Sequence, residues 1–194
     1  DDDSVMFTGV REGESLSALY RLDLKTRAVE KLYGFNDADI YDVAPDFSDQ
    51  DIVGVRAYRD RPRYHWLAPD NPAARVHAAL ERAFAGQSVS VTSTSEDGRL
   101  AIVFVDSDTN PGDYYLFDTK TMKADFLRAG RSWVDPRLMR PKRAIEVTAR
   151  DGLKLHGYVT TPVGDGPYPL VVLPHGGPHG VRDGWGFDWG VQVL

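Results

Sequence analysis

The feature that most constrains the fold is a series of short segments, between residues 5 and 127, in which apolar and polar residues alternate. Asp, Gly, Asn and Pro separate these segments, a pattern typical of antiparallel strands joined by tight turns. The stretch 88–127 is the clearest case, with strands expected at 88–94, 100–107, 114–118 and 122–127. Asp97-Gly98 and Pro111-Gly112 supply its first two turns. The sequence therefore predicts one four-stranded antiparallel sheet here.

A weak internal repeat relates the beginning of the chain to this sheet. Tyr20–Thr26 matches Tyr115–Thr121 at a spacing of 95 residues (118 − 23), and Leu32 matches Leu127. Half of that spacing is close to the ~40–50 residues of a propeller blade, so the two copies are expected two blades apart. The shared Asp-x-Lys-Thr element predicts a hairpin turn whose aspartate accepts hydrogen bonds from the backbone. A metal-binding role for these aspartates is the alternative.

Between the two copies the sequence predicts three more strands and one helix. The strands are expected near residues 41–44, 52–58 and 64–67. Asn71 suits the helix N-cap, Pro72 the first helical position, and Gly86 the exit. The spacing of the apolar residues predicts a buried face made of Val76, Leu80, Ala83 and Phe84. His77 lies off this face and is expected to face solvent.

Residues 133–143 have the character of a crossing segment, and a hairpin follows it. Asp135-Pro136 can open a short helical turn that Pro141 ends. Strands are then expected at 144–149 and 153–160, joined by a two-residue turn at Asp151-Gly152.

A run of four branched apolar residues, Leu170 to Leu173, comes next and predicts a strand buried on both faces, as in a parallel sheet. Pro174 ends it, and the Gly-rich stretch 176–180 follows. Such a loop allows a backbone N–H to approach a reacting oxygen. This is the layout of the oxyanion hole in α/β-hydrolases, where one donor comes from the loop after the third strand.

Four short motifs follow the hairpin or lie within it: Arg150-Asp151-Gly152, Leu155-His156-Gly157-Tyr158, Thr161-Pro162 and His175-Gly176-Gly177-Pro178. Together they resemble the start of the hydrolase domain of the prolyl oligopeptidase family, in its acylaminoacyl-peptidase and dipeptidyl-aminopeptidase-like branch. The resemblance covers almost the whole chain and implies a mainly β fold. Residues 1–130 would form about two and a half blades of a β-propeller. Residues 131–143 would be a linker, and 144–194 the opening strands of a truncated α/β-hydrolase domain.

In that family a serine attacks an acyl carbon and two donors hold the developing oxyanion. The resemblance implies that the N–H of Gly177 is one donor, with His175 alongside; a plain turn glycine and a structural histidine are the alternatives. His175 is not expected to be the general base, since the base follows the nucleophile in this fold. No Gly-x-Ser-x-Gly occurs in the 194 residues. The resemblance implies that the catalytic triad lies beyond Leu194, and no nucleophile is nominated within the chain.

Two further residues, Pro178 and Trp185, are candidates for a substrate pocket. Packing of the helix that begins near Phe187 on the sheet explains Trp185 equally well. His175 and His179 have the spacing of a zinc pair, but a Gly-Pro loop does not enforce the geometry that a helix would. We expect no metal and no cofactor.

Composition excludes several other classes of protein. The net charge of −6 and the short, Pro-interrupted basic cluster at 137–143 argue against nucleic-acid binding. No apolar run approaches the ~20 residues that span a bilayer, so no membrane partner is expected. The chain has no cysteine, which leaves its compartment open between cytoplasm and periplasm. Both ends of the sequence have the character of cut elements.

The resemblance to the prolyl oligopeptidase family implies a fragment of a serine peptidase that acts on peptide or acyl-peptide bonds through an acyl-enzyme. The 194-residue piece alone is expected to be inactive. Its expected partners are peptide substrates and the remainder of the same polypeptide, with homo-oligomers forming through open sheet edges. One alternative is another α/β-hydrolase, such as an esterase. The other is a non-catalytic, propeller-type binding module.

Overall fold

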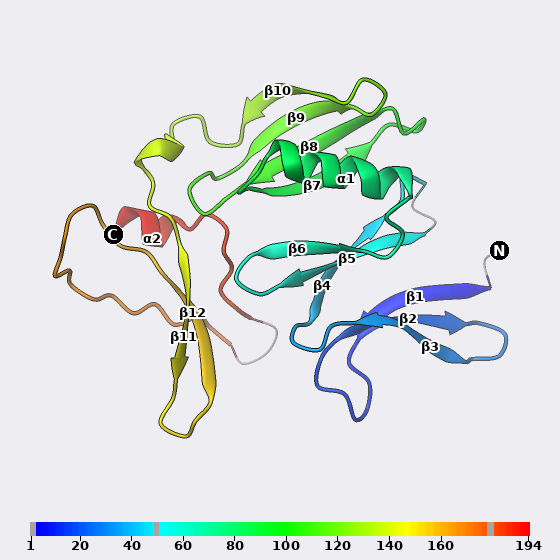
Figure 1. Cartoon of the computed structure of the whole chain (residues 1–194), viewed down its shortest axis with the longest axis horizontal. Helices are drawn as coiled ribbons and strands as arrows, with labels where there is room; N and C mark the ends of the chain where they lie inside the picture. The colour runs from blue at the N-terminus through cyan, green and yellow to red at the C-terminus, as the bar shows by residue number, and fades with distance from the viewer. Residues whose placement is uncertain (1–2, 49–50, 178–180) are drawn as a thin grey trace. The chain divides into compact units, whose positions relative to one another are not determined.

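The computed structural model describes residues 3–48, 51–177 and 181–194 (Figure 1). Strands dominate, and the described residues form four antiparallel sheets, so the predicted mainly β class is confirmed. Contacts within the chain define two compact units, Asp1–Leu80 and Glu81–Leu194. The predicted domain limits at residues 130 and 143 stay a prediction.

The first unit contains two three-stranded meanders. One has the order β1-β2-β3, and the other, at the predicted place, has the order β4-β5-β6. Their bounds are Ser4–Gly9, Ala18–Asp23 and Val29–Gly34 for β1 to β3, then Ile40–Pro45, Ile52–Tyr58 and Pro62–Trp66 for β4 to β6. Leu19 of β2 packs with Ile40 of β4 and Val55 of β5, each at most 6% exposed. These contacts form a core within the unit.

The helix α1 (Pro72–Ala83) begins where the sequence predicts. The Asn71 side chain accepts a hydrogen bond of 2.9 Å from the N–H of Ala73, and Gly86 follows the helix with φ +86°. The buried face differs from the prediction: Ala83 is exposed, and the buried residues are Ala73, Ala74, Val76, His77 and Leu80.

His77 was expected in solvent, and that prediction is wrong, because its side chain is 6% exposed. The rings of Tyr64 and Trp66, both on β6, lie 5.3 and 5.1 Å from the imidazole. An argument from helical periodicity treats histidine as a polar residue. It also does not include the aromatic rings of a neighbouring sheet, which here cover the imidazole. Tertiary packing therefore sets the width of the buried face.

The second unit contains the predicted four-stranded sheet. Its strands pair in the order β10-β9-β8-β7, with bounds Ser88–Thr94 for β7, Leu100–Asp106 for β8, Asp113–Asp118 for β9 and Lys123–Ala129 for β10. Ala101, Val103 and Val105 of β8 are each at most 1% exposed. The sheet is therefore a simple antiparallel meander with a buried row on its second strand, as the alternation predicts.

The internal repeat is visible in the backbone. Asp23 accepts hydrogen bonds from the N–H groups of Lys25 and Thr26, and Asp118 accepts the equivalent bonds from Lys120 and Thr121, all between 2.7 and 2.9 Å. The residue that follows each turn has positive φ, at 58° for Arg27 and 56° for Met122. The predicted hairpin role of these aspartates is confirmed.

The crossing segment and hairpin also form. A single 3-10 turn, Pro136–Leu138, is capped by Asp135. Strands β11 (Arg143–Thr148) and β12 (Lys154–Val159) pair antiparallel. The loop between them has three residues, whereas two were predicted. The N–H of Ala149 donates to the carbonyl oxygen of Leu153 at 2.8 Å, so only residues 150–152 lie between the bonded positions. Gly152 takes φ +89° at the last loop position, as in a type I turn with a bulge.

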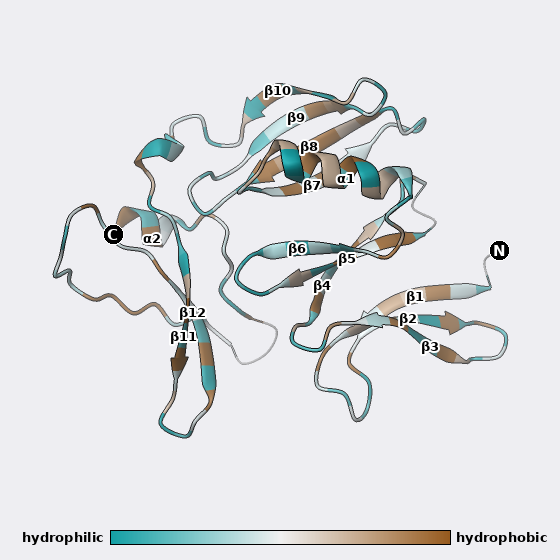
Figure 2. Cartoon of the chain, in the orientation of Figure 1, coloured by the Kyte–Doolittle hydropathy of each residue, from teal (hydrophilic) through white to brown (hydrophobic). Residues whose placement is uncertain are grey.

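The strand predicted at Leu170–Leu173 does not form in this structure. These four residues have no regular secondary structure and are 54–84% exposed. Figure 2 shows them as a hydrophobic run on the extended segment between β12 and α2 (Trp189–Val193). A strand buried on both faces needs neighbouring strands and covering helices. No described residues provide them here, so the apolar run stays in solvent.

Candidate functional site

The predicted oxyanion loop follows this exposed run. His175 is exposed, and its Nδ1 lies 2.6 Å from the carbonyl oxygen of Gly176, so its described contact is local. Pro178, His179 and Gly180 lie outside the described residues. The structure thus shows His175 and Gly177 as neighbours on an open loop, and it does not test their chemical roles.

Gly177 has no conformational need for glycine in this structure. Its φ lies outside the left-handed region, and a β-carbon placed on it would meet no atom within 4 Å. Gly176 is equally open. A glycine is required where φ is positive or where another backbone approaches closely, and neither applies here. Among the described residues, nothing therefore requires glycine at either position.

Trp185, predicted at a substrate pocket or in packing, is buried, at 3% exposure. Two aromatic neighbours, Phe187 and Trp189, stack edge to face with 5.1 Å between ring centroids. The Arg131 guanidinium lies 4.8 Å from the centre of the Trp189 ring. These contacts fit the packing explanation, and a pocket role for Trp185 stays a prediction.

A polar network that the sequence did not reveal holds this aromatic segment. The Lys142 ammonium donates to the carbonyl oxygens of Gly184 and Gly186 at 3.1 and 2.7 Å. The Lys142 N–H donates to the Asp108 carboxylate at 2.7 Å. Burial lowers the pKa of Lys142, while Asp188, Asp183 and Asp108 act in the opposite direction. Lys142 is thereby joined to the loop after β8 and to the segment before α2.

Gln192 of α2 extends the network. Its amide oxygen accepts from the N–H of Arg140 at 2.8 Å, and its amide nitrogen donates to the carbonyl oxygen of the same residue at 2.7 Å. A weaker bond of 3.3 Å reaches the carbonyl oxygen of Asp108. These groups hold backbone atoms in place and include no nucleophile next to a base. The network is therefore structural.

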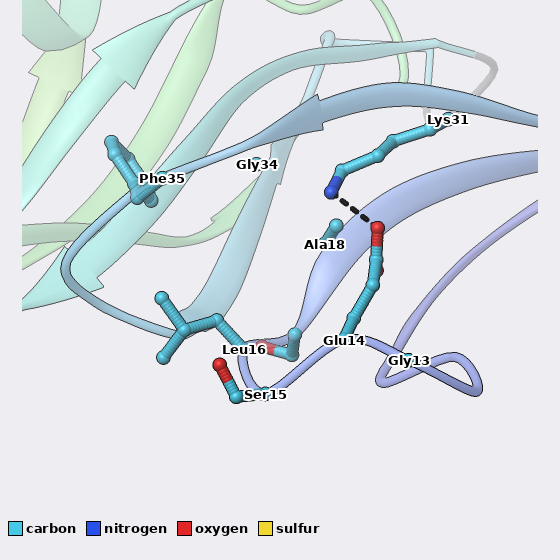
Figure 3. A pocket seen from close by; sticks show the side chains of 9 residues that line it. Gly13, Glu14, Ser15, Leu16, Ala18, Lys31, Gly34 and Phe35 are labelled. Carbon is cyan, nitrogen blue, oxygen red and sulfur yellow. Dashed lines mark hydrogen bonds and ion pairs between the residues drawn. The ribbon is translucent and has the colours of Figure 1, made fainter.

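A shallow hollow in the first unit has a volume of about 210 Å³ (Figure 3). It is lined by residues 13–18 together with Lys31, Gly34 and Phe35. Within it, the Lys31 ammonium and the Glu14 carboxylate form an ion pair of 2.7 Å, and the Tyr20 hydroxyl also donates to Glu14. Lys31 and then Tyr20 hold the pKa of Glu14 below its usual value.

This ion pair limits what the hollow can do. A general base needs a raised or near-neutral pKa, whereas the Glu14 carboxylate is held ionised by its two donors. The neighbouring serines, Ser15 and Ser17, have no base among these lining residues; the Ser17 hydroxyl donates instead to the Ile40 carbonyl at 3.1 Å. The hollow is therefore a polar surface feature without the parts of a catalytic site.

The described residues contain no group of three or more His, Asp or Glu side chains that could hold a metal ion. Among the same residues, no helix has the length and apolar character needed to cross a bilayer.

Comparison with known proteins supplies the class. No family model matches the chain. Over 196 aligned residues, which cover 96% of this chain, it is 27% identical to dipeptidyl aminopeptidase BIII from Pseudoxanthomonas mexicana. The chain spans only 28% of the length of that relative. The similarity runs through both units, so it is not confined to one motif.

A solved structure shares the fold. It is a protein assigned as a dipeptidyl aminopeptidase IV from Bacteroides ovatus, which matches with a TM-score of 0.59 at 18% identity. The match covers 99% of this chain and 30% of that one. A prolyl endopeptidase structure matches at a TM-score of 0.48 and 14% identity over 80% of this chain and 22% of that one, too weakly to support an inference.

These findings define the class of protein as a mainly β chain similar to part of a larger peptidase. The resemblance to the prolyl oligopeptidase family, in its dipeptidyl-aminopeptidase-like branch, is confirmed, and the relative that carries it is dipeptidyl aminopeptidase BIII.

Proposed function

We propose that this chain is part of a serine peptidase that hydrolyses peptide or acyl-peptide bonds through an acyl-enzyme. The observation that carries the proposal is the 27% identity to a dipeptidyl aminopeptidase over 96% of the chain. Because the chain matches only 28% of that relative, the activity is proposed for the longer polypeptide. The piece contributes β-propeller blades in residues 1–130, a linker in 131–143 and the opening of the hydrolase domain in 144–194.

The exposed apolar run Leu170–Leu173 supports the proposal that the rest of a longer polypeptide completes the hydrolase domain. Leu170 is 84% exposed and Val172 is 72% exposed, in a segment that would be central in a parallel sheet. Burying a side chain of this size contributes about 1.5–3 kcal/mol, so four neighbours in solvent represent a large unused driving force. Strands from the rest of the polypeptide would bury them and fix the direction of the loop that carries Gly177.

A fluorophosphonate probe tests whether the piece holds a nucleophile. The probe reacts with a serine activated by an adjacent base. We expect no labelling of the 194-residue chain and labelling of the longer polypeptide. Stoichiometric labelling of a serine in the 194-residue chain would contradict the proposal. A longer polypeptide that cleaves aminoacyl anilides no better than simple esters would favour the esterase alternative, and one that does neither would favour the binding module.

The oxyanion role of Gly177 is tested in the longer polypeptide by removing its N–H. Proline has no N–H, so Gly177→Pro should reduce turnover of a dipeptidyl anilide by about 10²–10³. Gly177→Ala keeps the donor and, since the position is open and its φ is not positive, should retain most of the activity. Equal activity of the two variants would show that the N–H of Gly177 is not an oxyanion donor.

A further inference from the structure

Four Asp-Gly pairs occur in the chain: Asp97-Gly98, Asp151-Gly152, Asp165-Gly166 and Asp183-Gly184. This dipeptide can rearrange without an enzyme, because glycine has no β-carbon to hinder its backbone nitrogen. That nitrogen attacks Cγ of the preceding aspartic acid, one water leaves, and a succinimide ring closes. Water then opens the ring, and attack at the former backbone carbonyl produces isoaspartate. The water lost is regained, so neither mass nor oxidation state changes.

Local structure determines which of the four pairs is free to react. Ring closure requires that the side chain turns back onto the next nitrogen, and it proceeds through the protonated carboxyl group, since a carboxylate is a poor electrophile. A glycine N–H or an aspartate side chain that is engaged in hydrogen bonds must be released first. Each such bond therefore slows the reaction.

Asp97-Gly98 is held on both sides of the reacting bond. The N–H of Gly98, which would attack, donates to the carbonyl oxygen of Ser95 at 2.8 Å. The Asp97 carboxylate accepts from the Ser95 hydroxyl at 2.6 Å and from the N–H of Arg99 at 3.1 Å. These two donors hold the pKa of Asp97 below its usual value, with Ser95 contributing more. The turn between β7 and β8 thus opposes ring closure.

Two further pairs are held by similar contacts. In the hairpin β11-β12, the N–H of Gly152 donates to the Ala149 carbonyl at 2.9 Å, and the Asp151 carboxylate accepts from the N–H of Leu153 at 3.1 Å. Before α2, the Lys142 ammonium donates to the carbonyl oxygen of Gly184 at 3.1 Å and so fixes the peptide that follows Asp183.

Asp165-Gly166 lacks all of these contacts. Both residues are exposed, and they lie in the stretch 160–177 between β12 and α2, which has no helix or strand (Figure 1). In the part of the chain that the structure describes, neither the Asp165 carboxylate nor the Gly166 N–H has a hydrogen-bond or ion-pair partner. The nearest hydrogen bond joins the Tyr168 hydroxyl to the Gly164 carbonyl and involves neither reacting group.

We propose that Asp165-Gly166 is the site at which this chain spontaneously forms isoaspartate, ahead of its three other Asp-Gly pairs. The product has one more methylene group in its backbone and a displaced carboxylate. This change falls five residues before the apolar run Leu170–Leu173 (170 − 165).

The test compares the folded 194-residue chain with the same chain unfolded in guanidinium chloride, both aged at neutral pH. Trypsin places the four pairs in separate peptides, 83–99, 151–154, 155–182 and 183–194, in which electron-transfer fragmentation identifies isoaspartate. In the unfolded chain the four rates should be similar. In the folded chain Asp165 should keep its unfolded rate to within about twofold, Asp97 and Asp151 should react at least roughly tenfold more slowly, and Asp183 should also be slower than Asp165.

Two variants identify the reacting residue and the cause of protection. Asp165→Glu should abolish isomerisation in peptide 155–182, which contains no other Asp or Asn, because glutamate would have to close a larger ring. Ser95→Ala removes the hydroxyl that bonds to Asp97. It should raise the rate at Asp97 towards the unfolded value and leave the rate at Asp165 unchanged.

Three results would overturn the proposal. They are a folded-state rate at Asp165 far below its unfolded rate, a folded-state rate at another pair that equals or exceeds it, and an unchanged rate at Asp97 in Ser95→Ala. Circular dichroism before and after ageing verifies that the folded samples remain folded. None of these measurements depends on peptidase activity, so the proposal fails or stands separately from the proposed function.

Discussion

The carboxylate of Asp108 accepts a hydrogen bond of 2.7 Å from the backbone N–H of Lys142, 34 positions further along the chain. Asp108 lies in the loop after β8 and is only 5% exposed, while Lys142 directly precedes β11. A buried carboxylate with a backbone donor fixes the path of the chain at Lys142 more firmly than a surface ion pair would. The four-stranded sheet and the hairpin of the second unit are connected through it.

Replacing Asp108 should therefore destabilise the second unit. Asp108→Ala leaves the N–H of Lys142 without this acceptor, and we expect a loss of about 1–3 kcal/mol in the free energy of unfolding. Urea denaturation of the 194-residue chain measures it. Asp125→Ala on exposed β10 is the control and should change stability by less than about 0.5 kcal/mol. Equal effects of the two substitutions would show that the Asp108 bond is not important for stability.

Gln192 should be responsible for attaching α2 to the backbone at Arg140. Gln192→Leu removes both hydrogen bonds to Arg140 while keeping a side chain of similar size. We expect amides of residues 189–193 to exchange faster, by roughly tenfold for a loss of about 1.4 kcal/mol. Val193→Ala, at an 80% exposed position, is the matched control. Unchanged exchange in α2 after Gln192→Leu would mean that other contacts hold the helix.

His77 should make the first unit sensitive to mild acid. Burial, and to a smaller extent the nearby Arg56, lowers its pKa from 6.5 to about 4. The folded state therefore favours the neutral ring, so its contribution to stability is complete above about pH 7.5 and is lost as pH falls from 6.5 towards 4. A shift of this size corresponds to roughly 3 kcal/mol.

The measurement is the free energy of unfolding between pH 7.5 and pH 5, where most carboxylates remain ionised. His77→Leu should remove most of the slope, since Leu does not titrate and Nδ1 of His77 has no hydrogen-bond partner among the described residues. His65→Gln, at an exposed position on β6, should leave the slope in place. A slope that survives His77→Leu would have to come from another group.

Two glycines with positive φ should respond differently to the same substitution. At Gly112, with φ +120°, a β-carbon would lie 2.2 Å from the Phe104 ring, whereas at Gly86, with φ +86°, it would meet nothing within 4 Å. Gly86→Ala should cost only the strain of the backbone, about 1–2 kcal/mol. Gly112→Ala adds overpacking of about 1–3 kcal/mol. Thermal unfolding compares them, and a lower melting temperature for Gly86→Ala would contradict the contact at Phe104.

The sequence by itself determined the elements whose causes are local. The strands β7 to β10 follow from alternating residues and turn glycines within 42 consecutive positions (88–129), and the meander follows because each strand pairs with the next. The turns at Asp23 and Asp118 were equally predictable, since each aspartate bonds to N–H groups two and three residues away. The N-cap of α1 at Asn71 and the glycine at its exit, Gly86, belong to the same group. In all of these, the partners are near in sequence.

Only the tertiary structure decided the features whose interaction partners lie far away in the sequence. His77 is buried because Tyr64 and Trp66 from a sheet cover it, and Asp108 is satisfied by a donor 34 residues away. The run Leu170–Leu173 has the composition of a central strand, but a strand forms only when neighbours accept its hydrogen bonds, and the described residues supply none. Local propensity determines which secondary structure a segment can adopt. Whether the segment adopts it depends on the backbone groups that are available as hydrogen-bond partners.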